Sequence, residues 1–192
     1  MSTRADLITN FIFARIPKTG GTSVSSVLGC RDVFHHNTAA KIRMDIGQEL
    51  WDSCFKFTFI RNPWDHAVSY YEATKNQLRL APQMIVSGSF GGWVLDGMKT
   101  FPMTRWIVPG QKQDPLLQEQ YIEDDIFVGR FENLQEDFDY VCDQIGRPSV
   151  ELPHLNPSKR QRDYRSYYQN PEVKRLVGEH GSGIIEKYEY QF

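Results

Sequence analysis

One segment near the start of the chain constrains the fold more than any other. It runs from Phe11 to Gly29 and reads FIFARIPKTGGTSVSSVLG. Its first six residues are mostly apolar and rich in β-formers, whereas the small residues after the two glycines are compatible with a helix. The segment therefore predicts a strand, a glycine-containing turn and a helix, which together form the first part of a βαβ unit.

The turn in this segment has the composition of an anion-binding loop. Gly20 and Gly21 let the backbone approach a ligand closely, and the N–H groups and dipole of a helix N-terminus attract negative charge. Lys18 adds a mobile positive charge, and Thr22 and Ser23 add hydroxyl groups. Because the lysine precedes the glycines, the turn is not the G-x-x-x-x-G-K-[ST] loop. The alternative interpretation is an ordinary strand-to-helix turn, capped by Thr22 or Ser23.

Length and composition favour a single globular domain over residues 1–192. Hydrophobic residues make up 40% of the chain and charged residues 24%, which is ordinary for a soluble protein. The formal net charge of −2 argues against a general nucleic-acid binder. The N-terminal ten residues are too polar for a signal-peptide core, and no apolar run approaches the ~20 residues that span a bilayer. We therefore expect a soluble protein without stable membrane insertion.

The three cysteines, Cys30, Cys54 and Cys142, are widely spaced. Neither a disulfide framework nor a C-x-x-C zinc pattern is present, which favours reduced thiols in a cytoplasmic setting. The simplest interpretation is that all three cysteines are buried and pack like small apolar residues.

Strand and helix patterns alternate along the chain. After the strand at 11–16, further strands are predicted at 55–60 and 126–129, because these runs are short, apolar and rich in β-branched or aromatic residues. Helices are predicted at 21–29, 38–50, 64–79, 131–145 and 171–188, the last of them interrupted by the HGSG segment His180–Gly183. The alternation predicts an α/β fold with a central parallel sheet flanked by helices. Residues 80–125, rich in Pro, Gly and aromatic residues, predict loops and short helices over the sheet.

A second strand-to-helix turn, RNPWD, follows the strand at 55–60. Asn62 suits the N-cap and Pro63 the first turn of the next helix. Arg61 follows the carboxyl end of the strand, where open α/β sheets bind ligands, and its guanidinium can hold a phosphate with two hydrogen bonds. Ser69 lies two helical turns further along and adds a hydroxyl. The alternative for Arg61 is a structural ion pair.

Together the two turns resemble the nucleotide-binding elements of the sulfotransferases that use 3′-phosphoadenosine-5′-phosphosulfate (PAPS). PKTGGTS resembles the 5′-phosphosulfate loop, and FIRNPWDHAVSYY resembles the 3′-phosphate element. IFVGRFENLQEDF and LPHLNPSKRQRDYRSYY are similar to later elements of the family, so the resemblance covers nearly the whole chain. It is closest to the Golgi-type and bacterial carbohydrate sulfotransferases, including the uronyl 2-O-sulfotransferase branch. It implies a P-loop-NTPase-like three-layer fold in a single sulfotransferase domain, with residues 80–125 on the acceptor side.

The resemblance implies a role for each matching residue. Lys18 is expected to contact the bridging oxygen between phosphate and sulfonate, and Arg61 and Ser69 to hold the 3′-phosphate. Arg160, in a basic run near the C-terminus, is a further candidate for that phosphate. The residues expected around the 5′-phosphosulfate are Lys18, Thr19, Gly20, Gly21, Thr22 and Ser23. After PAPS gives up its sulfonyl group, the expected nucleotide product is adenosine 3′,5′-bisphosphate (PAP). This chemistry requires no metal.

A histidine is expected to act as the general base, since the acceptor hydroxyl must lose a proton. In the uronyl 2-O-sulfotransferase branch a catalytic histidine lies in a Tyr-His-Gly-His context before the second strand, and Phe34-His35-His36 resembles it. His36 is the best match and His35 the second; a capping or core-edge histidine is the alternative. Glu72 is the fallback base, because other branches use a glutamate. His66 is expected to face solvent.

The predicted function is transfer of a sulfonyl group from PAPS to an acceptor hydroxyl by in-line displacement. The acceptor is a carbohydrate, a lipid headgroup or a small molecule, and the sequence does not distinguish them or predict an oligomeric state. A P-loop-type ATP-dependent kinase is the alternative enzyme, although the position of Lys18 counts against it. A non-catalytic nucleotide-binding module is the third hypothesis.

Overall fold

The computed structural model describes residues 10–30, 34, 36–78, 88–98, 114–155 and 163–192. The chain divides into two compact units. The first comprises residues 1–61 and 118–157, and the second residues 62–117 and 158–192. The prediction of one domain over residues 1–192 stays a prediction. Within the described ranges, no helix is both long and apolar enough to cross a membrane.

The first unit is built on a three-stranded parallel sheet in the order β1-β2-β3. The strands are β1 (Phe11–Phe13), β2 (Phe55–Ile60) and β3 (Phe127–Arg130). In the register of the sheet, Phe13 pairs with Phe57, and Ile60 pairs with Arg130. All three strands lie where the apolar runs predicted them, although β1 ends three residues early.

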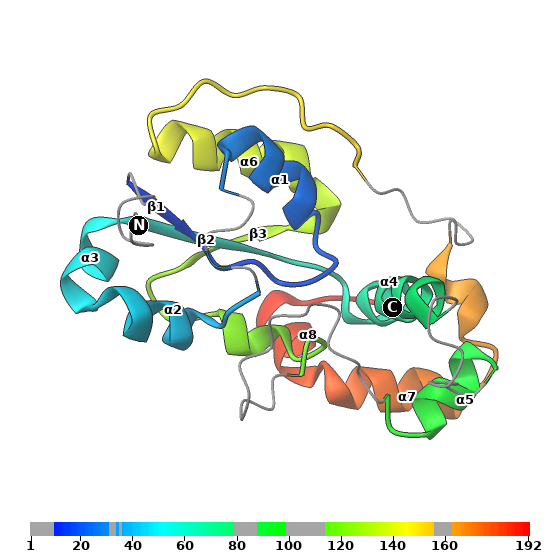
Figure 1. Ribbon diagram of the computed structural model, residues 1–192. Helices are drawn as coiled ribbons and strands as arrows, with labels where there is room; N and C mark the ends of the chain where they lie inside the picture. Colours follow the sequence, from blue (N-terminus) through cyan, green and yellow to red (C-terminus); the bar gives the residue numbers. More distant parts are fainter. Residues whose placement is uncertain (1–9, 31–33, 35, 79–87, 99–113, 156–162) are drawn as a thin grey trace. The chain divides into compact units, whose positions relative to one another are not determined.

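Helices cover both faces of this sheet (Figure 1). On one face lie α1 (Gly21–Leu28) and α6 (Leu134–Gln144), with the 3₁₀ turn η3 (Phe131–Asn133) before α6. On the other lie α2 (Ala39–Ile46) and α3 (Gln48–Ser53), and the 3₁₀ turn η2 (Gln118–Tyr121) contacts α2. The predicted α/β fold with a parallel sheet flanked by helices is therefore confirmed.

The two faces have separate cores because neighbouring strand residues point to opposite sides. The face under α1 and α6 is aromatic: the Phe13 and Phe57 rings stack at 4.6 Å, and Phe59 meets Phe13 edge-on at 5.9 Å. The face over α2 and α3 packs Ile12 and Trp51 together. All residues of β1 and all of β2 except Phe55 are buried, as expected for strands covered on both faces of a parallel sheet.

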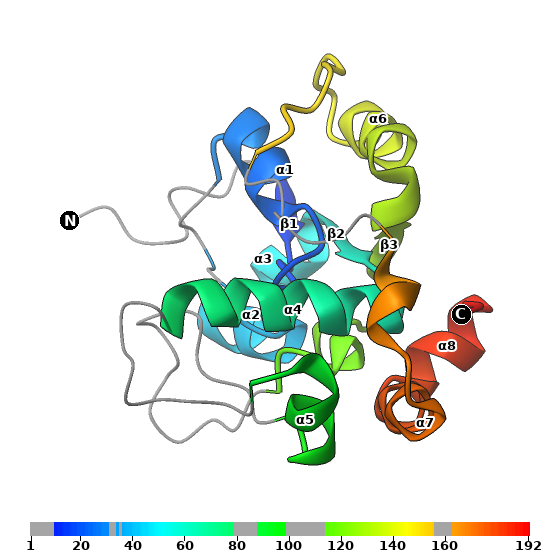
Figure 2. The same ribbon diagram turned by 90° about the vertical axis from the view of Figure 1, so that its right-hand side faces the viewer.

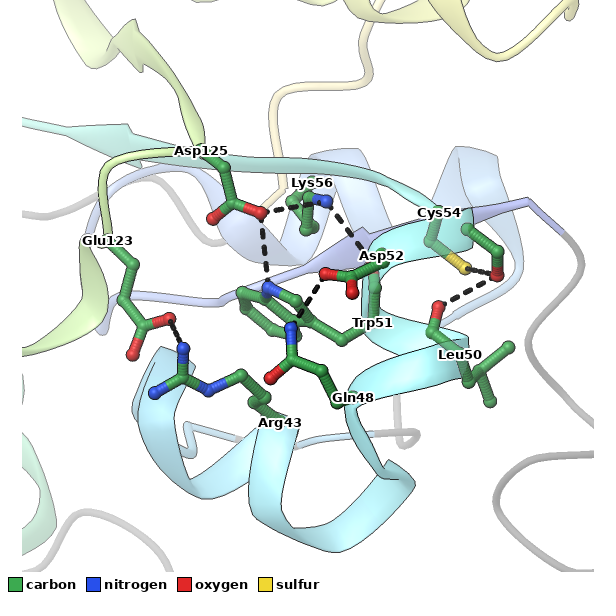
Figure 3. A network of polar contacts seen from close by, with 10 residues as sticks. Arg43, Gln48, Leu50, Trp51, Asp52, Cys54, Lys56, Glu123 and Asp125 are labelled. Atoms are coloured by element: carbon green, nitrogen blue, oxygen red, sulfur yellow. Dashed lines mark hydrogen bonds and ion pairs between the residues drawn. The ribbon is translucent and has the colours of Figure 1, made fainter.

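A polar network closes the amino-terminal ends of β2 and β3 (Figure 3). The ammonium of Lys56, only 9% exposed, lies 2.9 Å from a carboxylate oxygen of Asp125 and donates to the carbonyl of Trp51. The indole N–H of Trp51 donates to the same carboxylate. Burial raises the pKa of Asp125, but the Lys56 ammonium, the Trp51 indole N–H and a backbone N–H together leave the pKa below its usual range. The buried lysine charge is thus neutralised by a partner, as burial of a charge demands.

Two predicted helices are each divided by a glycine. The helix expected at 38–50 is α2 and α3, which meet at Gly47 with φ 87°. The helix expected at 171–188 is α7 (Pro171–His180) and α8 (Ser182–Tyr188), which meet at Gly181. A Cβ at Gly181 would lie 2.6 Å from the Pro63 side chain, so the break allows a close packing contact.

The second unit is helical (Figure 2). Its longest helix, α4 (Pro63–Leu78), contacts α7 and the 3₁₀ turn η4 (Tyr164–Tyr167), and α5 (Phe90–Leu95) also contacts α7. As predicted, Asn62 caps α4: its side-chain oxygen accepts from the N–H groups of Trp64 and Asp65. The amide nitrogen of Asn62 donates to the carbonyl of Gln191, which ties the C-terminal segment to this helix start.

His66 is buried, and the expectation that it faces solvent is wrong. It lies on α4, where residues 67–70 are also buried, so no face of this stretch is available to water. Elsewhere in the unit, Nε2 of His180 lies 3.0 Å from a carboxylate oxygen of Asp114. Burial raises the pKa of Asp114, but the His180 imidazole, the Leu116 N–H and the charge of His66 together leave it below its usual range.

We expect Asp114→Asn to lower the free energy of unfolding by about 1 kcal/mol at pH 5, as for a partly exposed ion pair. The variant keeps an oxygen for the Leu116 N–H, so charge is the main change. Because the folded pKa of Asp114 is depressed, its contribution is present above the unfolded value of about 3.9 and is lost as the pH falls through the folded value. Denaturant unfolding between pH 5 and 2 checks this; a constant difference between wild type and variant would contradict it.

Candidate functional site

The connection from β1 to α1 turns tightly around Lys18 and Gly20. Both residues have left-handed backbone, with φ 67° and φ 83° respectively. A lysine in this region is uncommon because its Cβ crowds the backbone, so surrounding contacts must hold it there. Gly20 is the N-cap of α1, and no side chain of the described residues caps this helix. The alternative interpretation, in which Thr22 or Ser23 caps this helix, is therefore wrong.

Both glycines of the turn allow close approaches. A Cβ on Gly20 would lie 2.6 Å from a methyl carbon of Leu134 and 3.4 Å from the ring of Phe131. A Cβ on Gly21 would lie 2.9 Å from the side chain of Arg15. Backbone N–H groups in the first turn of a helix have no acceptor within the helix. The turn therefore presents backbone donors at the positive end of the helix dipole, close to the Arg15 side chain.

Side chains hold the backbone carbonyls along this connection. Each donor comes from a different place: β2, the segment before α2, the turn itself and the residue after β2. The bonds run from Thr58 to Ala14 at 2.6 Å, from His36 to Arg15 at 2.9 Å, from Thr19 to Ile16 at 3.0 Å and from Arg61 to Lys18 at 2.9 Å. The path of the turn is thus fixed by neighbouring side chains as well as by its own sequence.

His36 lies beside the carboxyl end of β1. Its Nδ1 is 2.9 Å from the Arg15 carbonyl, and the ring is partly buried. A carbonyl oxygen only accepts, so Nδ1 carries the proton. In the neutral ring Nε2 then has the lone pair, which is the state that a general base needs. His35, the second candidate, lies outside the described residues.

Arg61 is 5% exposed and is held from several sides. Its Nη1 donates to the Lys18 carbonyl, and its guanidinium carbon lies 3.9 Å from the centre of the Phe131 ring. Its own backbone N–H and carbonyl both bond to the side-chain amide of Gln118, each at 2.9 Å. Arg61 therefore touches the turn directly, and its role toward a 3′-phosphate stays a prediction.

The hydroxyls of the turn differ in what they contact. Thr19 is fully buried, and its hydroxyl donates a hydrogen bond to the Ile16 carbonyl. Ser23 is 7% exposed, and its oxygen accepts from the N–H of Leu155 at 3.4 Å. Thr22 is partly exposed in the first turn of α1. Of these three hydroxyls, Thr22 is the best placed for a ligand at the helix N-terminus.

The remaining candidates lie in the second unit or outside the described residues. Ser69 lies on α4 and is 4% exposed. Glu72, on the same helix, accepts from the Tyr167 hydroxyl at 3.3 Å and lies 3.9 Å from the Lys75 ammonium, so it is engaged in side-chain contacts. Arg160 falls outside the described residues.

Sequence reasoning missed three residues around the turn: Arg15, Gln118 and Phe131. Phe131 follows the carboxyl end of β3 as Arg61 follows that of β2, and this shared position was a usable signal. Arg15 follows the observed end of β1, but the strand was predicted to continue through it. No local pattern distinguishes Gln118, because its contacts depend on a distant part of the chain.

The arrangement suits an anionic ligand. The glycine turn combines a helix N-terminus with a lysine, and its backbone contacts the buried guanidinium of Arg61. It lies at the carboxyl ends of parallel strands, which is the usual ligand edge of such sheets. Among the described residues, no group of three or more His, Cys, Asp or Glu side chains is placed to hold a metal.

The chain belongs to the sulfotransferase family, whose pattern it matches over residues 6–190. The match includes both turns and nearly the whole chain, so the predicted family is confirmed. Membership supports a sulfotransferase enzyme, and this coarse function agrees with the anion-binding character of the turn.

Two individual proteins are similar to this chain. An uncharacterized protein of Archaeoglobus fulgidus is 34% identical over 110 residues, which are 56% of this chain and 80% of that protein. The second is a sulfotransferase from Alicyclobacillus acidocaldarius, whose crystal structure is 12% identical in sequence. The structural match covers 98% of this chain and 90% of that protein's chain, with a TM-score of 0.38.

We expect Gly20→Ala to destabilise the protein more than Gly29→Ala. Both glycines have positive φ, but a Cβ on Gly29 meets nothing within 4 Å, whereas one on Gly20 meets Leu134. The Gly29 variant should lose about 1 kcal/mol from backbone strain, and the Gly20 variant about 1 kcal/mol more from crowding. Denaturant unfolding of both variants measures the difference. Equal losses would show that space beside Gly20 is not limiting.

Proposed function

We propose that this protein transfers a sulfonyl group from PAPS to an acceptor hydroxyl. One observation carries the proposal: Lys18 stands in left-handed backbone, with its carbonyl bonded to Arg61, directly before a helix that no described side chain caps. A lysine next to an uncapped helix N-terminus supports a site in which a cation and backbone donors together hold a phosphosulfate group. The match to the sulfotransferase family supports the same assignment.

The residues of the turn fit the 5′ end of the nucleotide. When bound, PAPS would supply the activated sulfonyl group and a phosphate leaving group. The N–H groups of Gly21 and Thr22 and the Thr22 hydroxyl would hold that phosphate. Gly20 and Gly21 have no Cβ atoms, so the Leu134 and Arg15 side chains can pack directly against the backbone of this turn. We assign Arg61 to the 3′-phosphate with Ser69 and Arg160, on the family resemblance.

Lys18 and His36 have complementary tasks in this proposal. Lys18 stabilises the negative charge that develops on the departing phosphate oxygen, a preorganised electrostatic effect. His36 accepts the proton of the acceptor hydroxyl at Nε2, because Nδ1 is held by the Arg15 carbonyl. The proton thus moves from the acceptor oxygen to the imidazole as the new oxygen–sulfur bond forms.

The nucleotide itself is tested by thermal unfolding with two ligands. PAP should stabilise the wild-type protein, by about 2.7 kcal/mol at one hundred times its dissociation constant, whereas ATP with Mg²⁺ should give little shift. An equal response to both ligands would remove the specificity for PAPS. A response to ATP alone would favour the kinase.

Variants then separate binding from chemistry. Lys18→Met keeps the apolar stem of the side chain and removes its charge, and His36→Gln retains hydrogen bonding but removes the base. Both variants should lose at least tenfold in sulfonyl transfer while still being stabilised by PAP. Glu72→Gln is the matched control, since Glu72 is the competing base. If Glu72→Gln loses turnover and His36→Gln does not, the base is wrongly assigned.

A further inference from the structure

Gln118 is an uncharged side chain buried beside the candidate site. It is 1% exposed, and it begins the 3₁₀ turn η2. Its amide oxygen accepts from the backbone N–H of Arg61, and its amide nitrogen donates to the backbone carbonyl of the same residue, both at 2.9 Å. One side chain thus provides a partner for both the main-chain N–H and the main-chain carbonyl of Arg61.

We call these two hydrogen bonds between the Gln118 amide and the Arg61 backbone the clasp. The clasp is needed because the sheet ends just before Arg61. The ladder to β1 ends with Phe57, and the ladder to β3 ends with Ile60. Buried backbone groups without partners are costly, so a residue one step beyond a central strand requires a substitute. The primary amide of glutamine offers a donor and an acceptor side by side, as a neighbouring peptide does.

The clasp reaches the turn through Arg61. With its backbone held, the Arg61 side chain donates to the Lys18 carbonyl and lies over the Phe131 ring. That ring is also 3.4 Å from the Cβ position of Gly20. The left-handed backbone of Lys18 is therefore supported by a chain of contacts that runs from Gln118 through Arg61.

We propose that Gln118 is a positioning residue for sulfonyl transfer: its amide fixes the Arg61 backbone, and Arg61 in turn holds Lys18 in its left-handed conformation. The catalytic part of this inference rests on the proposed function of Lys18. The structural part, a stiffened turn, stands apart from any activity and is measured separately.

Gln118→Met tests the inference, because methionine has similar length and volume but cannot form either strong hydrogen bond. The matched control is Val141→Ala, a buried substitution on α6 that lies in the core under β1 and β2. Amide hydrogen exchange of the peptide covering residues 17–24 is followed by mass spectrometry without nucleotide. Turnover of PAPS and binding of PAP are measured below the melting temperature of each variant.

Gln118→Met should exchange in residues 17–24 at least tenfold faster than Val141→Ala after correction for global stability. Its kcat should fall at least tenfold, and its dissociation constant for PAP should rise at least threefold. Exchange and kcat within twofold of the control would overturn the inference, as would faster exchange with an unchanged kcat. If wild type neither binds PAP nor turns over PAPS, the proposed function fails, and the exchange result alone decides the stiffening.

Gln118→Glu provides a second variant if the methionine variant does not fold. It keeps an oxygen for the Arg61 N–H but loses the N–H that donates to the Arg61 carbonyl. We expect changes in exchange and kcat in the same direction, between those of wild type and complete loss of the clasp. Wild-type values for both quantities in this variant would contradict the role of Gln118.

Discussion

The hydrogen bond from the Arg61 guanidinium to the Lys18 carbonyl is the contact on which the candidate site depends. It joins the residue after β2 to the turn after β1, and so links the carboxyl ends of two neighbouring parallel strands. Lys18 adopts a backbone conformation that side chains disfavour, and a charged donor on its carbonyl offsets that cost. A lysine held in this way approaches a ligand with less freedom to lose on binding.

The polar contacts at the two ends of the sheet differ in kind. At the amino-terminal ends, Lys56 and Asp125 neutralise each other beside Trp51, which closes the sheet with satisfied polar groups. At the carboxyl-terminal ends, arginine and histidine side chains donate to backbone carbonyls and leave a helix N-terminus facing the turn. The first arrangement neutralises a buried charge, whereas the second lies where we propose that an anionic ligand binds.

Much of the fold could be predicted because short apolar runs separated by helical patterns have few alternatives to a parallel sheet. The strand at 55–60 was predicted with its observed bounds, and Asn62 was predicted as a cap. The interruption of the last helix at His180–Gly183 was predicted, but the break at Gly47 was missed, because a single glycine is tolerated in many helices. His66 was placed in solvent because one polar residue says little about the burial of all sides of a helix.

The candidate site was predictable to the extent that its residues are local in sequence. The glycine turn and Lys18 were predicted because they closely follow a strand pattern, and His36 because Phe34-His35-His36 resembles a motif of the family. Gln118 and the Arg61–Lys18 bond do not, since each joins segments more than forty residues apart. Such contacts are set by the register of the sheet, which a sequence pattern does not specify.

A crystal structure of the protein with PAP would show directly whether the glycine turn binds the nucleotide. We expect the 5′-phosphate to lie within hydrogen-bonding distance of the N–H groups of Gly21 and Thr22, with the Lys18 ammonium beside its outward-facing oxygen. Electron density for PAP away from the glycine turn, or a bound nucleotide that leaves Lys18 more than a hydrogen-bond length from the 5′-phosphate, would contradict it.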